Sequence, residues 1–336
     1  MAKKVFIATV ALLALSMMLV SLGSACVNLV YLRLPQRKIP PIVSTEWLNN
    51  NLNLENLVVL DVRGEDAYNT GHIPGAINVA EAKWYVNDPG TVPPNVAWWM
   101  ELPPDEDIFT LIGDAGITKN SLVVVVGSTS GLLVPMPLAL YSTAGITRVA
   151  ITLLYAGVKN VAILDGGYDK WVADGYSTET TPNTPTPVTY TGKVDKTMFV
   201  SKDYVKKRIG KSIIVDARDP DVYFGVTQEP WAAYLGHIPK AKSLPTPWLW
   251  NINKEDGTAA NYITYKDVDT LREMALGVVG GNKHREIIVY CGVGGYASTM
   301  YFVLSEVLGY TNVRLYDGSA QEWTQTGEPV VVYRWE

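Results

Sequence analysis

Short apolar runs alternate with amphipathic stretches along most of the chain. Six apolar, β-branched runs have the length of buried strands, at residues 57–60, 122–126, 161–164, 212–215, 286–290 and 313–315. Between them, apolar residues recur with helical spacing, for example at residues 45–51, 204–209 and 297–308. This alternation predicts an α/β fold in which a central, mainly parallel sheet is flanked by helices.

The second half of the chain repeats the first. The segment VVLDVR at 58–63 returns as IIVDAR at 213–218, and GHIPGA at 71–76 returns as GHIPKA at 236–241. NVAILDG at 160–166 returns as NVRLYDG at 312–318, and a Trp follows each copy at the same distance. Three motifs in the same order predict two tandem copies of one domain. We place the copies at residues 43–178 and 195–336, joined by a Pro- and Thr-rich linker at 179–194.

The N-terminus has the features of an export signal. Two lysines precede an apolar stretch at residues 5–22, and small residues then lead to Cys26. We therefore expect a signal at residues 1–25, a tether at 26–42, and a periplasmic or cell-surface location. Two forms of membrane attachment stay open. Cys26 resembles the lipid-bearing Cys of bacterial lipoproteins, although Gly23 departs from that pattern; alternatively the apolar segment is an uncleaved anchor.

Composition narrows the class of protein. With 48% hydrophobic and 18% charged residues, the 336-residue chain fits two globular domains. The net charge is −5 and no Lys or Arg run stands out, so a nucleic-acid partner is not expected. The two cysteines are Cys26 and Cys291. Because Cys26 belongs to the targeting segment, we expect no disulfide and a free thiol at Cys291.

The segment around Cys291 is suited to holding an anion. The apolar run IIVY at 287–290 leads into CGVGGYAS at 291–298, and a helical pattern follows at once. Glycines let the backbone curl so that its N–H groups share one hollow, and the helix N-terminus adds partial positive charge. These groups are expected to lower the pKa of the thiol and to hold a terminal persulfide anion. The alternative is a tight turn whose Cys only packs in the core.

These motifs together resemble the rhodanese superfamily of tandem-domain sulfurtransferases. The resemblance rests on the Asp-x-Arg strand end, the Gly-His-Ile-Pro turn, the Cys- and Gly-containing loop, and the late Asp-Gly with its following Trp. It implies that Cys291 attacks a sulfane sulfur donor, becomes a persulfide, and passes the outer sulfur to cyanide, a thiol or sulfite. It implies no metal and no organic cofactor. Gly127 stands where the first domain would carry its Cys, so that domain is expected only to close one side of the cleft, through an insertion at 129–146.

The resemblance also suggests the substrate-binding residues. They are Gly292, Val293, Gly294, Gly295, Tyr296, Ala297 and Arg218. Thiosulfate-using members often carry Arg or Lys in the loop, and many tandem members carry an Arg where this chain has Val222. Polysulfide is therefore considered beside thiosulfate as the donor. Tyr296, Tyr223 and Trp323 are expected either to line the pocket or to lie in the core.

Residues shared by both copies are interpreted as structural. Asp216 and Arg218 recur in the Cys-less copy, so we expect a buried pair, with assistance to substrate binding as a second role for Arg218. The histidines of the two Gly-His-Ile-Pro turns are likewise expected to be structural.

Other Cys chemistries lack their partners. A Cys-based phosphatase needs an Arg six positions after its Cys, where this chain has Ala297. Three histidines provide neither a nearby base for a protease nor a zinc site. The hypothesis from another class is an exported, non-catalytic binding module, or a persulfide carrier that serves a membrane sulfur-metabolism complex.

Overall fold

The computed structural model describes residues 37–88, 98–130, 136–253 and 259–336. The predicted export signal, Cys26 and most of the predicted tether lie outside these residues. Two units separate by their internal contacts, Met1–Lys38 and Ile39–Glu336, and the second holds both sequence copies.

The first copy forms a five-stranded parallel sheet. Its strand order is β1 (Ile42–Val43), β7 (Asn160–Leu164), β6 (Leu122–Val126), β2 (Leu57–Asp61) and β3 (Ile77–Asn78). The central strand β6 has the sequence LVVVV and is buried along its whole length, as expected for a strand covered on both faces.

The second copy repeats this sheet. Its order is β10 (Ala241–Ser243), β9 (Ile213–Asp216), β13 (Ile287–Tyr290), β14 (Val313–Tyr316) and β8 (Phe199–Val200), again all parallel. Read from the other edge, the order matches that of the first sheet strand by strand. The predicted α/β class, the duplication and the six predicted strands are confirmed, with ends that shift by at most one residue.

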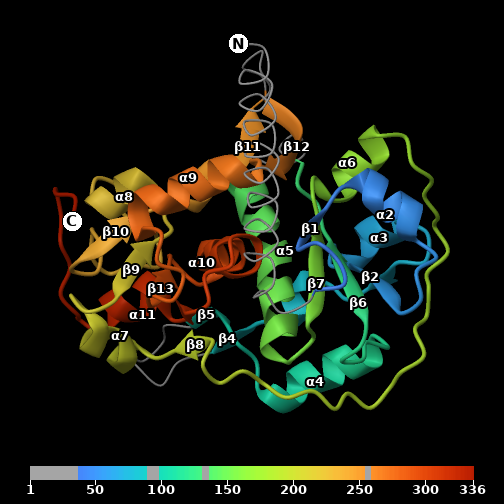
Figure 1. Cartoon of the computed structure of the whole chain (residues 1–336), viewed down its shortest axis with the longest axis horizontal. Helices are drawn as coiled ribbons and strands as arrows, with labels where there is room; N and C mark the ends of the chain where they lie inside the picture. The colour runs from blue at the N-terminus through green and yellow to red at the C-terminus, as the bar shows by residue number, and fades with distance from the viewer. Residues whose placement is uncertain (1–36, 89–97, 131–135, 254–258) are drawn as a thin grey trace, which may run out of the picture. The chain divides into compact units, whose positions relative to one another are not determined.

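Helices cover both sheets (Figure 1). In the first copy they are α2 (Thr45–Asn51), α3 (Glu65–Thr70), α4 (Asp105–Asp114), α5 (Met136–Tyr155) and α6 (Gly167–Ala173). In the second they are α7 (Lys202–Arg208), α8 (Pro220–Phe224), α9 (Val268–Val279), α10 (Gly295–Phe302) and α11 (Ser319–Gln325). Short 3-10 helices occupy Glu81–Lys83 and Thr246–Leu249, and a π-helical turn, Val303–Val307, extends α10. Ser44 and Ser201 cap equivalent helices by accepting a backbone N–H, so even the local start signal is duplicated.

The two copies meet around a pseudo-two-fold axis. Helices α5 and α10 pack side by side at the centre of Figure 1. On the axis, the hydroxyls of Thr147 and Thr299 are 3.0 Å apart, and these residues are equivalent positions separated by 152 residues. One buried hydrophobic cluster includes residues from both sheets and from both helices. The interface is therefore part of the core.

Two equivalent hairpins cross this interface in opposite directions. They are β4 (Val86–Asp88) with β5 (Trp98–Glu101), and β11 (Trp250–Asn253) with β12 (Ala259–Tyr265). Leu102 N–H donates to Asp317 across the interface at 2.9 Å, and Tyr265 N–H donates to Asp165 at 2.8 Å. Since Asp165 and Asp317 are equivalent residues, each copy uses the same carboxylate to hold the other copy's hairpin.

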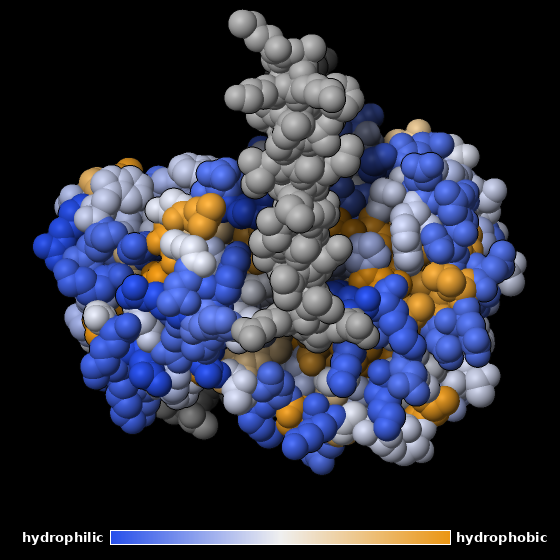
Figure 2. Space-filling view, in the orientation of Figure 1, coloured by the Kyte–Doolittle hydropathy of each residue, from blue (hydrophilic) through white to orange (hydrophobic). Residues whose placement is uncertain are grey.

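The surface in view is mainly hydrophilic. Where described residues are coloured in Figure 2, apolar side chains form separate patches among polar ones. Within the residues that the structure describes, none of the helices combines the length and the apolar character that crossing a bilayer requires.

Candidate active site

Cys291 lies directly after the buried strand β13, at the carboxyl end of the second sheet. The residue is 3% exposed. Gly294 has φ +93° and forms the N-cap of α10, so the chain turns sharply from the strand into the helix. The strand–turn–helix arrangement expected from the sequence is confirmed.

Backbone N–H groups surround the sulfur. Gly294 N–H donates to Cys291 Sγ at 3.1 Å, and the N–H groups of Val293 and Ala297 also hydrogen-bond to it. The start of α11 fixes the loop from behind, because Ala320 N–H donates to the Cys291 carbonyl at 2.9 Å. The loop is thus an anion-binding nest with the sulfur at its focus.

The pKa of Cys291 contradicts the sequence-based expectation. Burial raises the pKa of the thiol, and the negative charge of Glu229 raises it further. The three N–H groups lower the pKa but do not offset burial. The expectation of a lowered pKa was wrong because burial depth and the approach of Glu229 depend on tertiary packing. At neutral pH the resting residue is mainly a thiol.

A buried ion pair supports the floor of the site. Arg218 donates to both oxygens of Asp216, with its closest contact at 2.6 Å, and to the Gly236 carbonyl at 2.8 Å. Arg63 and Asp61 repeat this arrangement in the first copy. The prediction of a buried structural pair is confirmed. Arg218 is 1% exposed, so its route to the cavity is its 3.3 Å contact with Glu229.

A cavity of about 600 Å³ opens beside Cys291, between the two copies. From the second copy it is lined by Cys291, Gly292, Val293, Gly295, Tyr296, Glu229 and Trp231. From the first copy it is lined by Glu81, Tyr85, Asn87, Trp99, Met100, Tyr141, Ser142 and Ala144. Of the residues predicted to bind substrate, four thus line the cavity with Cys291, namely Gly292, Val293, Gly295 and Tyr296. Gly294 and Ala297 provide N–H groups beneath the sulfur, and Arg218 is buried behind Glu229.

The first copy closes one side of this cavity, as expected. Part of that wall is α5, which begins inside the segment interpreted as an insertion. Because α5 is the counterpart of α10, the segment is a lengthened version of a shared helix and its preceding loop, of which Pro135 lies outside the described residues.

Of the aromatics expected in either the pocket or the core, two lie in the core. Tyr223 is fully buried, donates its hydroxyl to the Ala241 carbonyl at 2.8 Å and stacks on His237. Trp323 is 1% exposed and donates its indole N–H to the Pro329 carbonyl. Of the three aromatics, Tyr296 alone lines the cavity. His237 Nδ1–H donates to the Tyr223 carbonyl and His72 Nδ1–H donates to the Tyr68 carbonyl, which agrees with their structural interpretation.

Glu229 and Trp231 were missed from the sequence, although a signal was present. In the first copy the Arg of Asp-x-Arg and the Gly whose carbonyl it binds are 8 residues apart, and in the second they are 18 apart. The extra segment carries Glu229 and Trp231 to the cavity. This segment packs closely against Gly292. A Cβ added at Gly292 would lie 2.5 Å from Trp231 Nε1, so a larger residue has no room there.

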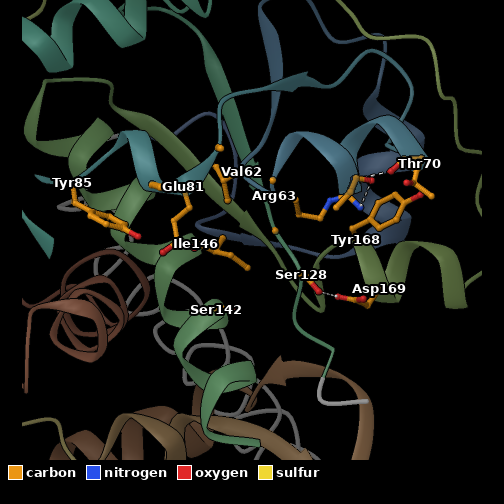
Figure 3. Close-up of a pocket in the computed structure, with 16 residues that line it drawn as sticks. Val62, Arg63, Thr70, Glu81, Tyr85, Ser128, Ser142, Ile146, Tyr168 and Asp169 are labelled. Carbon is orange, nitrogen blue, oxygen red and sulfur yellow. Dashed lines mark hydrogen bonds between the residues drawn. The ribbon is translucent and has the colours of Figure 1, made fainter. Parts of the chain in front are cut away.

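The first copy has a matching hollow without a thiol, shown in Figure 3. A Cβ at Gly127 would lie 2.5 Å from Ile146 Cγ1, so a side chain there has no room. Asp169 occupies the nest: the N–H groups of Thr129 and Ser130 donate to its Oδ2 at 2.6 and 3.1 Å, and Ser128 Oγ donates at 2.9 Å. The dashed line between Ser128 and Asp169 in Figure 3 marks one of these bonds.

The equivalent residue in the second copy leaves its nest open. Gln321 lies 152 positions after Asp169, and its Oε1 accepts the Trp99 N–H at 2.9 Å instead. The nest of the second copy therefore remains for the sulfur of Cys291. Across the described residues, no group of three His, Cys, Asp or Glu side chains is placed to hold a metal ion.

Comparisons with known proteins match both copies. The model of the rhodanese-like domain matches residues 44–174 and 201–326. A Synechococcus elongatus protein named as a candidate thiosulfate sulfurtransferase is 31% identical over 291 residues, which is 86% of this chain and 84% of that protein. A Thermus thermophilus protein named sulfur carrier protein TtuD is 30% identical and covers 84% of this chain and 93% of its own length.

Solved structures share the fold. The anaerobic ergothioneine biosynthesis enzyme from Chlorobium limicola, in complex with trimethyl histidine, superposes with a TM-score of 0.70 at 22% identity. The match covers 87% of this chain and 70% of that one.

Proposed function

The chain belongs to the rhodanese-like family and is a sulfurtransferase, and we propose that Cys291 carries the sulfur that it transfers. The observation that carries this proposal is the position of the Cys291 sulfur. It lies at the focus of three backbone N–H groups and borders a cavity large enough for a small molecule.

The proposed reaction has two steps. The Cys291 thiolate attacks the sulfane sulfur of the donor, and a bond forms between Cys291 Sγ and that sulfur. The rest of the donor leaves as sulfite or a shortened polysulfide, with the electron pair of the broken bond. An acceptor nucleophile then attacks the outer sulfur, and the pair of the S–S bond returns to Cys291 Sγ. This is covalent catalysis with ping-pong kinetics. The N–H groups stabilise the persulfide anion between the steps.

The cavity wall favours polysulfide over thiosulfate as the donor. None of the described residues that line it is Lys, Arg or His. The sulfonate of thiosulfate carries charge away from the reacting sulfur and would have no cationic partner there. Val222, at the position where many tandem members carry an Arg, is buried in α8.

Turnover with cyanide tests the proposal. We expect the protein to form thiocyanate from polysulfide and cyanide, with parallel double-reciprocal lines, and to use thiosulfate with a lower kcat/KM. Cys291→Ser should form none with either donor. Intersecting lines, or thiocyanate formation by Cys291→Ser above the uncatalysed rate, would refute a covalent sulfur on Cys291.

A carrier role is the second candidate. The family relative named as a sulfur carrier and the depth of Cys291 both favour a persulfide that is stored before delivery. A carrier would load fully in one turnover, and its discharge to small acceptors would be much slower than its loading. Single-turnover loading and discharge rates distinguish the two roles.

We also propose that residues 1–25 direct export and that residue 26 or the apolar segment holds the protein at a membrane. Cell fractionation of wild type and Cys26→Ser separates the forms of attachment. Release of the variant from the membrane indicates a lipid, and retention indicates a peptide anchor. Wild type in the cytosolic fraction would contradict export.

A further inference from the structure

The cavity beside Cys291 has a negative wall. Arg218 is the cation nearest to Glu229, but it is already bound to both oxygens of Asp216. Carboxylates therefore outnumber guanidinium groups at this end of the cavity. The Glu229 side chain is 12% exposed; burial raises the pKa of its carboxyl, and the contact with Arg218 acts in the opposite direction.

Glu81 adds a second carboxyl from the first copy. No hydrogen bond or ion pair joins its carboxyl to any other described residue, and it borders both hollows. Burial raises its pKa to about 7. In Figure 3 its side chain extends between Tyr85 and Ile146. A Cβ added at Gly145 on α5 would overlap the carboxyl, so α5 leaves space for it.

Aromatic rings form the rest of the wall. Tyr141 stacks on Tyr296 with centroids 5.2 Å apart, and Trp231 lies 6.3 Å from Tyr141 and 6.2 Å from Trp99. Ring faces carry a negative quadrupole and attract cations, most strongly where water is excluded. The pKa of Tyr141 is raised to about 12, first by burial and then by neighbouring acidic groups, of which Glu229 has the largest effect. Ring faces and carboxyl groups without a lining cation thus favour a positively charged guest in this cavity.

We propose that this cavity selects a cationic acceptor, a small thiol that bears an ammonium group, held between the aromatic rings and the carboxylates of Glu81 and Glu229. The proposal rests on the sulfurtransferase function with Cys291 as carrier. The thiolate of the acceptor attacks the outer persulfide sulfur, a new S–S bond forms on the acceptor, and the old bond's electron pair returns to Cys291 Sγ. No further oxidant or reductant takes part.

Single-turnover discharge tests the charge preference. Protein loaded with polysulfide and freed of excess donor is mixed with 2-aminoethanethiol, 2-mercaptoethanol or mercaptoacetate, which are cationic, neutral and anionic thiols of similar size. The loss of the added sulfur is followed by intact mass, and each rate is divided by the rate of that thiol with a small-molecule persulfide. We expect the cationic thiol to exceed the neutral one by about tenfold, and the anionic one to be slowest.

Variants assign the preference to the two carboxylates. Glu229→Gln and Glu81→Gln should each lower the ratio of cationic to neutral rates several-fold. Glu46→Gln, on an exposed residue of α2, is the matched control and should leave the ratio unchanged. Because each ratio is internal to one variant, a partial loss of folded protein does not alter it. As an independent measurement, tetramethylammonium chloride should slow discharge by 2-mercaptoethanol more than sodium chloride at equal ionic strength.

The outcomes separate the two proposals. If wild type gains no sulfur from polysulfide, the proposed function itself is contradicted. Normal loading with equal corrected rates for the three thiols, or fastest discharge by mercaptoacetate, would overturn the cationic acceptor and leave Cys291 as the sulfur carrier.

Discussion

In the first copy the loop after β6 holds the carboxylate of Asp169, whereas in the second the loop after β13 holds the sulfur of Cys291. Each loop directs its backbone N–H groups into a hollow of its own, and the two hollows occupy equivalent places in the two copies. The difference is the occupant: a fixed side chain in one nest, a reactive atom in the other. One scaffold therefore serves as a support or as a chemical site, depending on whether its nest is filled from within.

The copies differ again in the segment before the Gly-His-Ile-Pro turn. In the first copy this segment is short, and Arg63 binds Asp61 and the Gly71 carbonyl. The longer version in the second brings Glu229 into contact with Arg218 and places Trp231 on the cavity wall. The shared pair supports the fold, and the added segment shapes the site.

The largest expected effect comes from breaking an interaction that only one copy has. Arg148 of α5 is fully buried and binds both oxygens of Asp317 across the interface, with contacts of 2.5 and 3.0 Å. Arg148→Met leaves the Asp317 carboxylate without its cationic partner and with the Leu102 N–H still bound to it. We expect a loss of about 3–5 kcal/mol in the free energy of unfolding. Urea denaturation measures it.

An exposed pair provides the control for this change. Lys196 and Asp105 form a salt bridge with side chains 70% and 38% exposed. Lys196→Met should leave the free energy of unfolding nearly unchanged, because water screens this exposed pair. Equal losses in the two variants would show that the buried pair does not hold the copies together.

Placing a thiol in the first nest tests the difference in occupants. Gly127→Cys in the Cys291→Ser protein should destabilise the fold by about 1–3 kcal/mol, because the new side chain meets Ile146. It should gain no sulfur from polysulfide, since Asp169 already binds the N–H groups. Intact mass and thermal melting follow both effects; loading of this variant at the wild-type rate would mean that nest occupancy does not separate the copies.

The smallest effect concerns the pKa of Cys291. Burial and Glu229 raise this pKa, so the thiolate fraction at neutral pH is below that of free cysteine and rises with pH. Alkylation by iodoacetamide should therefore increase up to a midpoint above the ordinary thiol value. Glu229→Gln removes a negative neighbour and should shift the midpoint down, with a rate gain of roughly threefold at pH 8. An unchanged or raised midpoint in this variant would contradict the role given to Glu229, and Glu46→Gln is again the control.

Features that the two copies share were predictable from the sequence. The β-branched runs predict the strands of the two sheets. The structural role of the Asp216–Arg218 pair was predictable because the same pair recurs in the copy that lacks the Cys. Cys291 and its Gly-rich turn were also predictable, since strand, turn and helix are contiguous in the chain.

The cavity wall was not predictable in the same way. Glu81, Tyr141 and Trp99 come from the other copy, and their approach to Cys291 depends on the packing of α5 against α10. The predicted direction of the Cys291 pKa shift was wrong for the same reason, because burial of the thiol depends on the assembled interface. Tyr223 and Trp323 were ambiguous because core and pocket aromatics have the same local spacing.

The most direct test of the central claim is the intact mass of wild type and Cys291→Ser after exposure to polysulfide and then to cyanide. The account predicts that wild type alone gains about one sulfur, ~32 Da, and that cyanide removes it as thiocyanate. Equal loading of both proteins, or loading of neither, would contradict Cys291 as the sulfur carrier.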